Sequence, residues 1–240
     1  QLRLVIFAQN VTERQLEEWR NRFGAPLMQI YGMTEIAGQP LANPLDYPGD
    51  NMSLGMVTLG YECRVVNDSG VDVPQGESGQ LLVKGIPGQT LMKGYFKNSN
   101  ATEETIRDGW LRTGDIVMVD DRGYFRFVDR AKDMIKSSGE NVAAGEVEAV
   151  IKQHGKVVDA AVIGVPDSMR DESIKAFIVP CDDEVVSEAE IIEFCRERLS
   201  KFRVLEFVEF RKELPRTSVG KIQKHLLRSE EAARREHDQT

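Results

Sequence analysis

Five consecutive residues, Tyr31 to Glu35, carry the side chains that nucleotide chemistry requires. The Tyr31 ring can stack on a base, and Gly32 lets the backbone approach a phosphate closely. The hydroxyl of Thr34 can donate to a phosphate oxygen, while the carboxylate of Glu35 is a hard oxygen ligand suited to Mg²⁺. Because Tyr-Gly is common in turns and Thr-Glu is common at helix starts, the segment gains weight only from motifs further along the chain.

Three later residues could complete such a site. The carboxylate of Asp115 can accept both hydroxyls of a ribose, and the Arg130 guanidinium could reach the same sugar or a phosphate. Lys221, in a loop before a helix, could stabilise charge that develops on a transferring carboxylate and phosphate. Each also has an ordinary explanation: Asp115 ends a Gly-Asp turn, Arg130 pairs with Asp129 at the surface, and Lys221 is a solvated helix start.

The standard ATP-binding fingerprints are absent from the sequence. Gly220 and Lys221 do not end a Walker A loop, and residues 139–145 do not match Gly-x-Gly-x-x-Gly. Residues 134–141 predict a strand that runs into a small, polar turn. That turn could let the backbone approach a narrow ligand such as a pantetheine arm, although a plain hairpin turn also explains it.

Strand, helix and strand must position the first of these motifs. Residues 2–7 predict a buried strand, a capping box at residues 12–15 opens a helix to about residue 23, and residues 27–31 predict the returning strand. This order predicts an α/β layer whose ligand edge lies at the carboxyl end of its strands, where Tyr31 to Glu35 would sit.

Two further regions follow the α/β edge, which covers residues 1–54. Residues 55–131 are rich in glycine and in short alternating apolar segments, which predicts a mostly antiparallel, barrel-like unit that a short helix beginning at Asn100 interrupts. From about Lys132 the pattern predicts a small α+β domain over residues 132–240. Its predicted helices cover residues 145–154, 187–200 and 221–235, and its predicted strands cover residues 157–165, 173–179 and 206–210.

The composition argues against several other classes of protein. The net charge of −8, from 39 acidic and 31 basic residues, argues against a general nucleic-acid surface. No apolar run approaches the roughly 20 residues of a transmembrane segment. Three cysteines without a pair motif indicate buried thiols in a reducing compartment, so we expect a cytoplasmic protein. The three histidines are scattered and give little support to a His-based metal site.

The four motifs, in this order and spacing, resemble the later core motifs of the adenylate-forming superfamily. That superfamily includes acyl-CoA synthetases, firefly luciferase and peptide-synthetase adenylation domains, and the resemblance covers essentially the whole chain. Most relatives carry a Gly-Gly-Ala-Pro-like stretch where this chain has Ala8, Gln9 and Asn10, a departure that points to the crotonobetaine/carnitine–CoA ligase group. The motifs are Tyr31–Glu35, Trp110–Asp115, Gly123–Asn141 and Pro215–Lys221, and residues 84–88 and 167–177 also resemble that group.

The resemblance implies that five residues near the first motif contact the nucleotide or its metal. Tyr31 would stack on adenine, and Gly32 and Gln9 would also border the nucleotide. Thr34 would bond the AMP phosphate, and Glu35 would help to hold Mg²⁺.

The resemblance also implies roles for the later motifs. Asp115 would bind the ribose hydroxyls with help from Arg130, and Lys221 would bridge the substrate carboxylate and the α-phosphate. Lys132 would be the hinge about which the small domain rotates. Three residues would then lie near the CoA tunnel: Ser138, Gly139 and Glu140.

The implied fold is the C-terminal part of a large adenylation domain followed by a small mobile domain. The implied activity joins a crotonobetaine-like, carnitine-like or other short carboxylic acid to CoA, with ATP and Mg²⁺. The family's phosphate loop precedes the Tyr31 motif in relatives and is not in this sequence, so we expect a C-terminal half that is inactive alone. Two alternatives stay open: an adenylation domain that loads a carrier protein, and a truncated, non-catalytic nucleotide-binding module. The resemblance also leaves a homodimer open.

Overall fold

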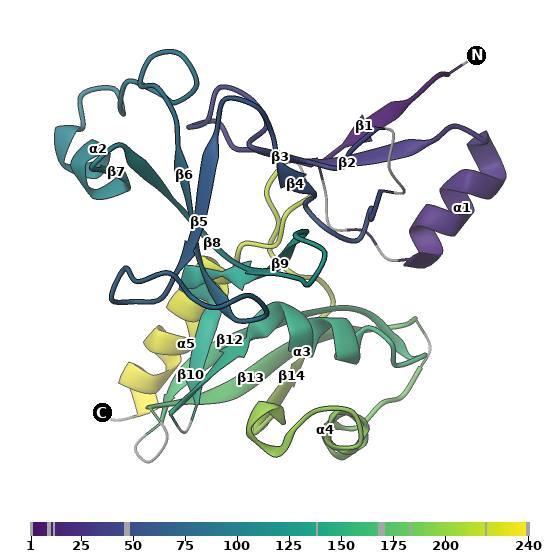
Figure 1. Cartoon of the computed structure of the whole chain (residues 1–240). Helices are drawn as coiled ribbons and strands as arrows, with labels where there is room; N and C mark the ends of the chain where they lie inside the picture. The colour runs from purple at the N-terminus through teal and green to yellow at the C-terminus, as the bar shows by residue number, and fades with distance from the viewer. Residues whose placement is uncertain are drawn as a thin grey trace. The chain divides into compact units, whose positions relative to one another are not determined.

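The structure is a computed structural model that describes residues 2–8, 11, 13–45, 49–137, 139–167, 171–182, 184–218 and 220–238. Figure 1 shows its elements in chain order, and they divide into two compact units, Gln1–Ala131 and Lys132–Thr240. Gln9 and Ser138, two of the predicted site residues, lie outside the described residues.

The first unit begins with two parallel strands joined by a helix. Its four-stranded sheet has the order β1-β2-β3-β4, formed by β1 (Val5–Phe7), β2 (Leu27–Tyr31), β3 (Leu41–Ala42) and β4 (Met56–Val57), with α1 (Glu13–Phe23) between the first two strands. A parallel pair needs a crossover connection, and α1 provides it while burying Leu16. The predicted order of strand, helix and strand is therefore confirmed, and Tyr31 is the last residue of β2. The first strand differs from its prediction, because it begins at Val5 and Ile6 in it is 55% exposed.

The second sheet of this unit is antiparallel throughout, as the sequence predicted. It has the order β5-β6-β8-β7 with β9 also paired to β8, and its elements are β5 (Glu62–Val66), β6 (Ser78–Lys84), α2 (Ser99–Thr105), β7 (Ile106–Arg107), β8 (Trp110–Val119) and β9 (Phe125–Arg130). One apolar core joins the two sheets, because Tyr31 and Leu41 pack with Leu81 and Leu111.

The short helix α2 begins earlier than the sequence predicted. Asn98 caps it, because its side-chain oxygen accepts the N–H of Ala101 at 3.1 Å. The predicted start at Asn100 is therefore wrong by about one residue, since an asparagine two positions upstream satisfies the free backbone donors.

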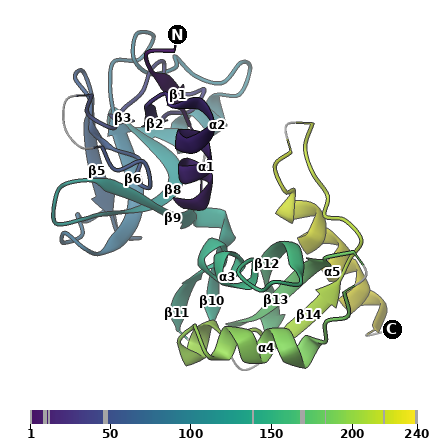
Figure 2. The same cartoon turned by 90° about the vertical axis from the view of Figure 1, so that its right-hand side faces the viewer.

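The second unit is a five-stranded sheet with helices on both faces (Figures 1 and 2). The sheet has the order β11-β10-β13-β12, with β14 paired to β13. Its elements are η1 (Ala131–Asp133), β10 (Met134–Ser137), β11 (Glu140–Ala143), α3 (Ala144–Ile151), β12 (Val157–Asp167), β13 (Asp171–Pro180), α4 (Glu188–Arg196), η2 (Lys201–Arg203), β14 (Phe207–Phe210) and α5 (Lys224–Asp238).

Alternation along β12 explains the two covered faces of this sheet. Ala160 and Val162 pack in the core that contains residues of α3 and α4, whereas Ala161 and Ile163 pack with Leu227 of α5. Successive side chains of a strand point to opposite faces, so one apolar strand can serve two helix layers.

Two helix starts in this unit test the sequence predictions. Ser187 caps α4 as predicted, because its hydroxyl accepts the N–H of Glu190 at 3.2 Å. The last helix was predicted from Lys221, but α5 begins at Lys224, because the backbone of Lys221 is bonded into a hairpin. Among the residues that the structure describes, no helix has the length and apolar character needed to cross a bilayer.

Candidate functional site

Asp115 lies inside a strand, although the sequence predicted a turn at the end of Trp110–Asp115. The strand bulges here. Between two successive paired positions, β8 has three residues, Thr113 to Asp115, whereas β6 has only Leu81. Gly114 has a φ of +72°, which glycine adopts at little cost. A bulge re-aims the side chains of a strand, and Asp115 is directed into the interior, where its side chain is 2% exposed.

The two carboxylate oxygens of Asp115 have different partners. The hydroxyl of Tyr31 donates to Oδ2 at 2.6 Å, and Nε of Arg130 lies 2.7 Å from Oδ1. Thr113 holds the strand beside them, because its hydroxyl donates to the Leu81 carbonyl and accepts the Asp115 N–H. Burial, together with the negative charge of Asp115, raises the pKa of Tyr31, so the phenol stays protonated as the donor.

This cluster resolves one alternative for Arg130. Its guanidinium pairs with Asp115, and its backbone N–H donates to Oδ1 of Asp129 at 2.7 Å. A buried carboxylate that is oriented from two sides retains lone pairs that can accept further donors, such as the hydroxyls of a diol. The Tyr31 ring is itself buried in the core, so its stacking on adenine stays a prediction.

Gly32 is required by the chain itself. A Cβ at this position would lie 2.8 Å from the carbonyl oxygen of Gly38. From the sequence we expected Gly32 to allow a phosphate to approach the backbone. In the structure it allows the backbone of Gly38 to approach. Any larger residue would therefore push apart the turn that follows β2.

Glu35 is held by a residue that the sequence did not single out. The hydroxyl of Tyr95 donates to Oε1 of Glu35 at 2.9 Å, and the N–H of Met92 donates to the Glu35 carbonyl at 2.8 Å. Thr34 beside it is exposed. The Gly94-Tyr95 pair after a short apolar segment was the available signal, but nothing in the sequence links it to Glu35 across 60 positions.

The donor set around Glu35 fits a magnesium ion that is shared with a phosphate. Among the described residues no group of three or more His, Cys, Asp or Glu side chains could form a complete metal cage. Mg²⁺ commonly takes only one or two protein carboxylates and fills its other positions with water and substrate phosphates. The half-buried, oriented carboxylate of Glu35 is suited to that use.

Lys221 lies in an exposed hairpin of the second unit. We call this segment the Lys221 hairpin, which is closed by the bridge between Arg216 and Ile222. The N–H of Thr217 donates to the Lys221 carbonyl at 2.8 Å, and the hydroxyl of Thr217 accepts the Lys221 N–H at 3.1 Å. The predicted loop before a helix is thus an ordered turn, and the alternative that Lys221 starts the helix is wrong.

The remaining predicted residues also belong to the second unit. Lys132 is exposed in η1, where the two units meet along the chain, and Gly139 turns the β10–β11 hairpin with a φ of +80°. Glu140 is the first residue of β11 and pairs with Ser137. The structure therefore brings Tyr31, Asp115 and Arg130 together in the first unit. It places Lys132, Gly139 and Glu140 in the second unit.

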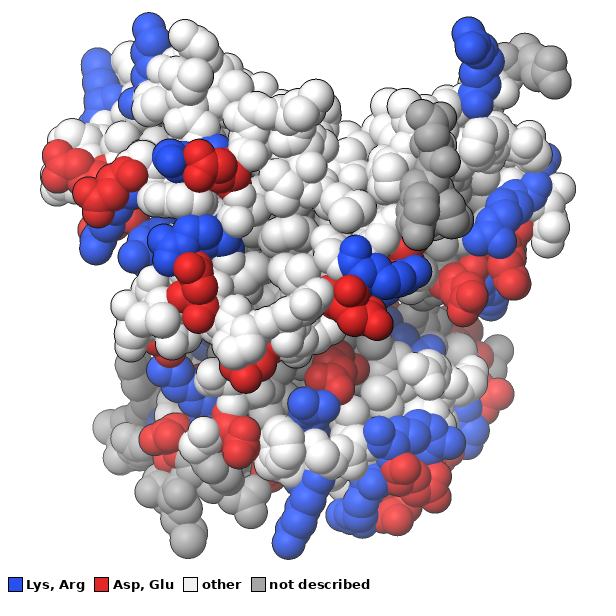
Figure 3. Space-filling view, viewed as in Figure 1, with Lys and Arg blue, Asp and Glu red and all other residues white. Residues whose placement is uncertain are grey.

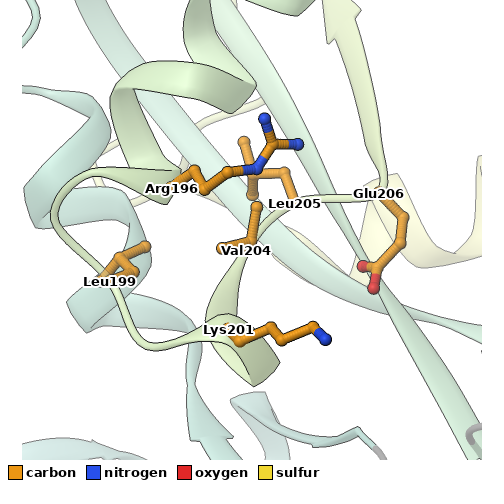
Figure 4. Close-up of a pocket in the computed structure, with 6 residues that line it drawn as sticks. All are labelled: Arg196, Leu199, Lys201, Val204, Leu205 and Glu206. Carbon is orange, nitrogen blue, oxygen red and sulfur yellow. The ribbon is translucent and has the colours of Figure 1, made fainter.

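A pocket of 430 Å³ lies in the second unit near η2. Figure 4 shows Lys201 and Glu206 extending toward the same side of it. Figure 3 shows that Lys and Arg side chains on one face are interspersed with Asp and Glu. None of the predicted site residues lines the pocket, whose lining consists of Arg196, Leu199, Lys201, Val204, Leu205 and Glu206.

Two family models match the chain. The AMP-binding enzyme model matches residues 1–96, and the model of the AMP-binding enzyme C-terminal domain matches residues 146–221. Together they cover more than half of the chain.

The chain is similar to a bacterial CoA ligase along almost all of its length. An Escherichia coli protein named crotonobetaine/carnitine–CoA ligase is 44% identical over 225 residues, which are 92% of this chain and 43% of the relative. This chain therefore spans less than half the length of that relative.

Solved structures confirm the predicted fold class. ATP-bound MatB from Rhodopseudomonas palustris has a TM-score of 0.84 and 32% identity, over 95% of this chain and 45% of the other. The anthranilate CoA ligase AuaEII, solved with anthranoyl-AMP, has a TM-score of 0.81 and 33% identity, over 97% of this chain and 44% of the other.

Proposed function

This chain belongs to the AMP-binding enzyme family, and on that premise we propose that it is the C-terminal half of an ATP-dependent acyl-CoA ligase. The observation that carries the proposal is its 44% identity, over 92% of its length, to a protein named crotonobetaine/carnitine–CoA ligase. The likeness of its fold to a CoA ligase solved with an acyl adenylate supports the same reaction class.

In the proposed first step the substrate carboxylate attacks the α-phosphorus of ATP. The bond from that phosphorus to pyrophosphate breaks, and an acyl-AMP forms. Lys221 bridges the carboxylate and the α-phosphate, where its positive charge opposes the negative charge that gathers in the transition state. Thr34 donates to the same phosphate.

The nucleotide is proposed to be held mainly by the first unit. Tyr31, Gly32 and Gln9 border the adenine side, and Asp115 accepts the ribose hydroxyls. The contacts that Asp115 makes with Tyr31 and Arg130 support this role, because they fix the direction of the carboxylate before any ligand arrives.

Glu35 is proposed to be the protein ligand of Mg²⁺. When bound, the ion would offset negative charge on the phosphates of ATP. The bond from Tyr95 supports the role, because it leaves the second oxygen of Glu35 to face a ligand in a defined orientation.

In the proposed second step the CoA thiol attacks the acyl carbon, and AMP leaves with the electrons of the acyl–oxygen bond. The small domain turns about Lys132, which removes Lys221 from the site. The turn brings in the residues proposed for the CoA tunnel, Ser138, Gly139 and Glu140. The position of Lys132 at the border of the two units supports its role as a hinge.

A short carboxylic acid, crotonobetaine-like or carnitine-like, is the proposed substrate. A trimethylammonium group favours an aromatic or acidic wall. In the first unit a pocket of 440 Å³ is lined by Gly38 and Gln39 together with apolar residues that include Ile6 and Met28. Because Gly38 and Gln39 follow Glu35 closely in the sequence, we propose that this pocket borders the acyl group. A cytoplasmic location and a homodimer stay proposals.

The roles of the two steps are tested with Lys221→Ala in a full-length protein that carries this chain. We expect adenylate formation, followed by ATP–pyrophosphate exchange, to fall by about 10²–10³-fold. Thioester formation from supplied acyl-AMP should be unchanged. Lys212→Ala, which removes another exposed lysine of the same unit, is the matched control. Equal loss of both half-reactions in Lys221→Ala contradicts the proposed role.

The 240-residue chain alone is expected to show no exchange, because the family's phosphate loop is not in its sequence. Exchange by the chain alone would contradict this expectation. Transfer of the acyl group to a carrier protein in place of CoA would favour the carrier-loading alternative.

A further inference from the structure

Two ion pairs flank the Lys221 hairpin. On the side before the turn, Arg216 donates from Nη1 to the Gly220 carbonyl at 2.6 Å, and its Nη2 pairs with Asp159 of β12. Asp159 also pairs at 2.8 Å with Lys152, the residue that caps the end of α3. A single arginine therefore connects the Gly220 carbonyl of the hairpin to β12, the edge strand of the sheet, and, through Asp159, to the end of α3.

On the side after the turn, Lys224 begins α5 and pairs with Glu148 of α3 at 2.7 Å. Both side chains are 13% exposed. The same oxygen of Glu148 accepts the N–H of Val162 on β12 at 2.8 Å. This second pair is therefore mostly shielded from solvent and is tied to the sheet backbone.

The two pairs converge on the same two elements, α3 and β12. Asp159 and Val162 lie on β12, Glu148 lies in α3, and Lys152 caps the end of α3 one turn after Glu148. Lys221 itself is exposed, and no ion pair involves its side chain among the described residues. Its ammonium group is thus free to meet a ligand while the backbone on both sides is held.

We propose that Arg216 and Lys224 are positioning residues that hold Lys221 in place through Asp159 and Glu148. The inference rests on the proposed function, because it assigns the held lysine to adenylate formation. A displacement of about 1 Å in a catalytic group can cost about 10²-fold in rate, so the backbone that carries a long, flexible side chain must be fixed.

The first test measures the hairpin without any reaction. In the 240-residue chain, Arg216→Gln should speed hydrogen exchange of the Thr217, Gly220 and Lys221 amides by at least about tenfold, while amides of α4 are unchanged. The matched control is Arg196→Gln, which breaks an exposed pair with Glu193. Unchanged exchange in Arg216→Gln overturns the proposal.

Charge reversal then separates a specific pair from general loss of folding. Arg216→Asp should speed exchange as Arg216→Gln does. The double variant Arg216→Asp with Asp159→Arg should slow exchange again in part, because it restores the pair with β12 but not the bond to the Gly220 carbonyl. Thermal unfolding of each variant shows whether the unit is still folded. A folded double variant whose exchange is as fast as that of Arg216→Asp contradicts pairing through Asp159.

The second test asks whether the held geometry serves catalysis. In a full-length protein, Arg216→Gln should slow adenylate formation about tenfold and leave thioester formation from supplied acyl-AMP unchanged. Lys221→Ala in the same assay separates the two ideas. If Lys221→Ala has no effect, the proposed function fails. If it abolishes adenylation while Arg216→Gln and Lys224→Gln do not slow it, only the positioning inference fails.

Discussion

The carboxylate of Asp115 and the ammonium group of Lys221 are held in opposite ways. Asp115 is buried in the first unit, where it contacts Tyr31 and Arg130. These two residues lie 84 and 15 positions from it in the sequence. Lys221 is exposed on a hairpin of the second unit, and its closest backbone partner, Thr217, is four positions away.

The comparison shows which contacts position each of the two side chains. Asp115 depends on the packing of a whole unit, so the same contacts that orient it also stabilise the fold. Lys221 depends on a local turn and its two flanking ion pairs, so it can be changed without disturbing a core. A carboxylate that is proposed to receive a nucleotide benefits from rigidity, while a lysine that acts in only one of two proposed steps benefits from exposure.

The largest effect should come from removing the buried carboxylate. Asp115→Ala leaves the Tyr31 hydroxyl without its acceptor and Arg130 without its partner. Breaking a buried pair typically costs 3–5 kcal/mol, and because Arg130 is half exposed we expect about 3 kcal/mol. Urea unfolding of the 240-residue chain measures this loss. Asp72→Ala, which breaks the exposed pair with Arg64, should cost less than about 1 kcal/mol. Equal losses would remove the distinction between the two regions.

Much of the fold could be predicted from local patterns. The strand at Leu27–Tyr31 follows from a short, mostly apolar segment, and the capped start of α4 follows from a serine three residues before a glutamate. Bounds shifted where a longer-range bond decided them. The helix expected from Lys221 begins at Lys224, because the Thr217 side chain and backbone bind Lys221 into a turn.

The candidate site was predictable as residue types but not as pairs. Tyr31, Asp115 and Glu35 were identified from their chemistry. Their partners were not, because Tyr31 meets Asp115 only after two sheets pack together, and Tyr95 reaches Glu35 from 60 positions away. The turn expected at Asp115 is a bulge within β8. A Gly-Asp pair is compatible with a turn and with a bulge, and only the pairing with the neighbouring strand shows which of the two forms.

A smaller effect should follow from removing one atom of the Asp115 cluster. Tyr31→Phe keeps the buried ring and deletes the hydroxyl that donates to Asp115 at 2.6 Å. A hydrogen bond to a charged group contributes about 1.5–3 kcal/mol, so we expect a loss of about 2 kcal/mol in urea unfolding. Tyr61→Phe is the matched control, because that hydroxyl makes only a 3.5 Å contact with the Thr90 carbonyl. A larger loss in the control would show that the cluster does not stabilise the unit.

Acid should affect the second unit through a different carboxylate, Glu209. Although burial alone would raise its pKa, bonds from Arg234, Lys175 and Arg211 lower the pKa of Glu209 from 4.5 to about 2. A carboxylate with a lowered folded pKa stabilises the protein above the unfolded pKa. That stability is lost as pH falls from about 4.5 to about 2.

Glu209→Gln isolates this contribution. The difference in unfolding free energy between the parent and the variant should be about 1 kcal/mol at pH 6 and should vanish toward pH 2. Chemical unfolding at a series of pH values measures it. A difference that does not change with pH would show that the cations do not stabilise the ionised form.

The smallest effect on stability should come from the residue with the largest proposed effect on rate. Lys221→Ala removes an exposed side chain for which the described residues provide no ion pair, and it leaves the backbone bonds to Thr217 in place. Substitutions of this kind usually change stability by less than about 0.5 kcal/mol. Urea unfolding should therefore not distinguish the variant from its parent, and exchange at Thr217 and Gly220 should also be unchanged. A loss above 1 kcal/mol would mean that Lys221 is part of the packing of its unit, as Asp115 is. With stability unchanged, a loss of adenylate formation in the same variant reports the chemistry of the ammonium group and not the condition of the fold.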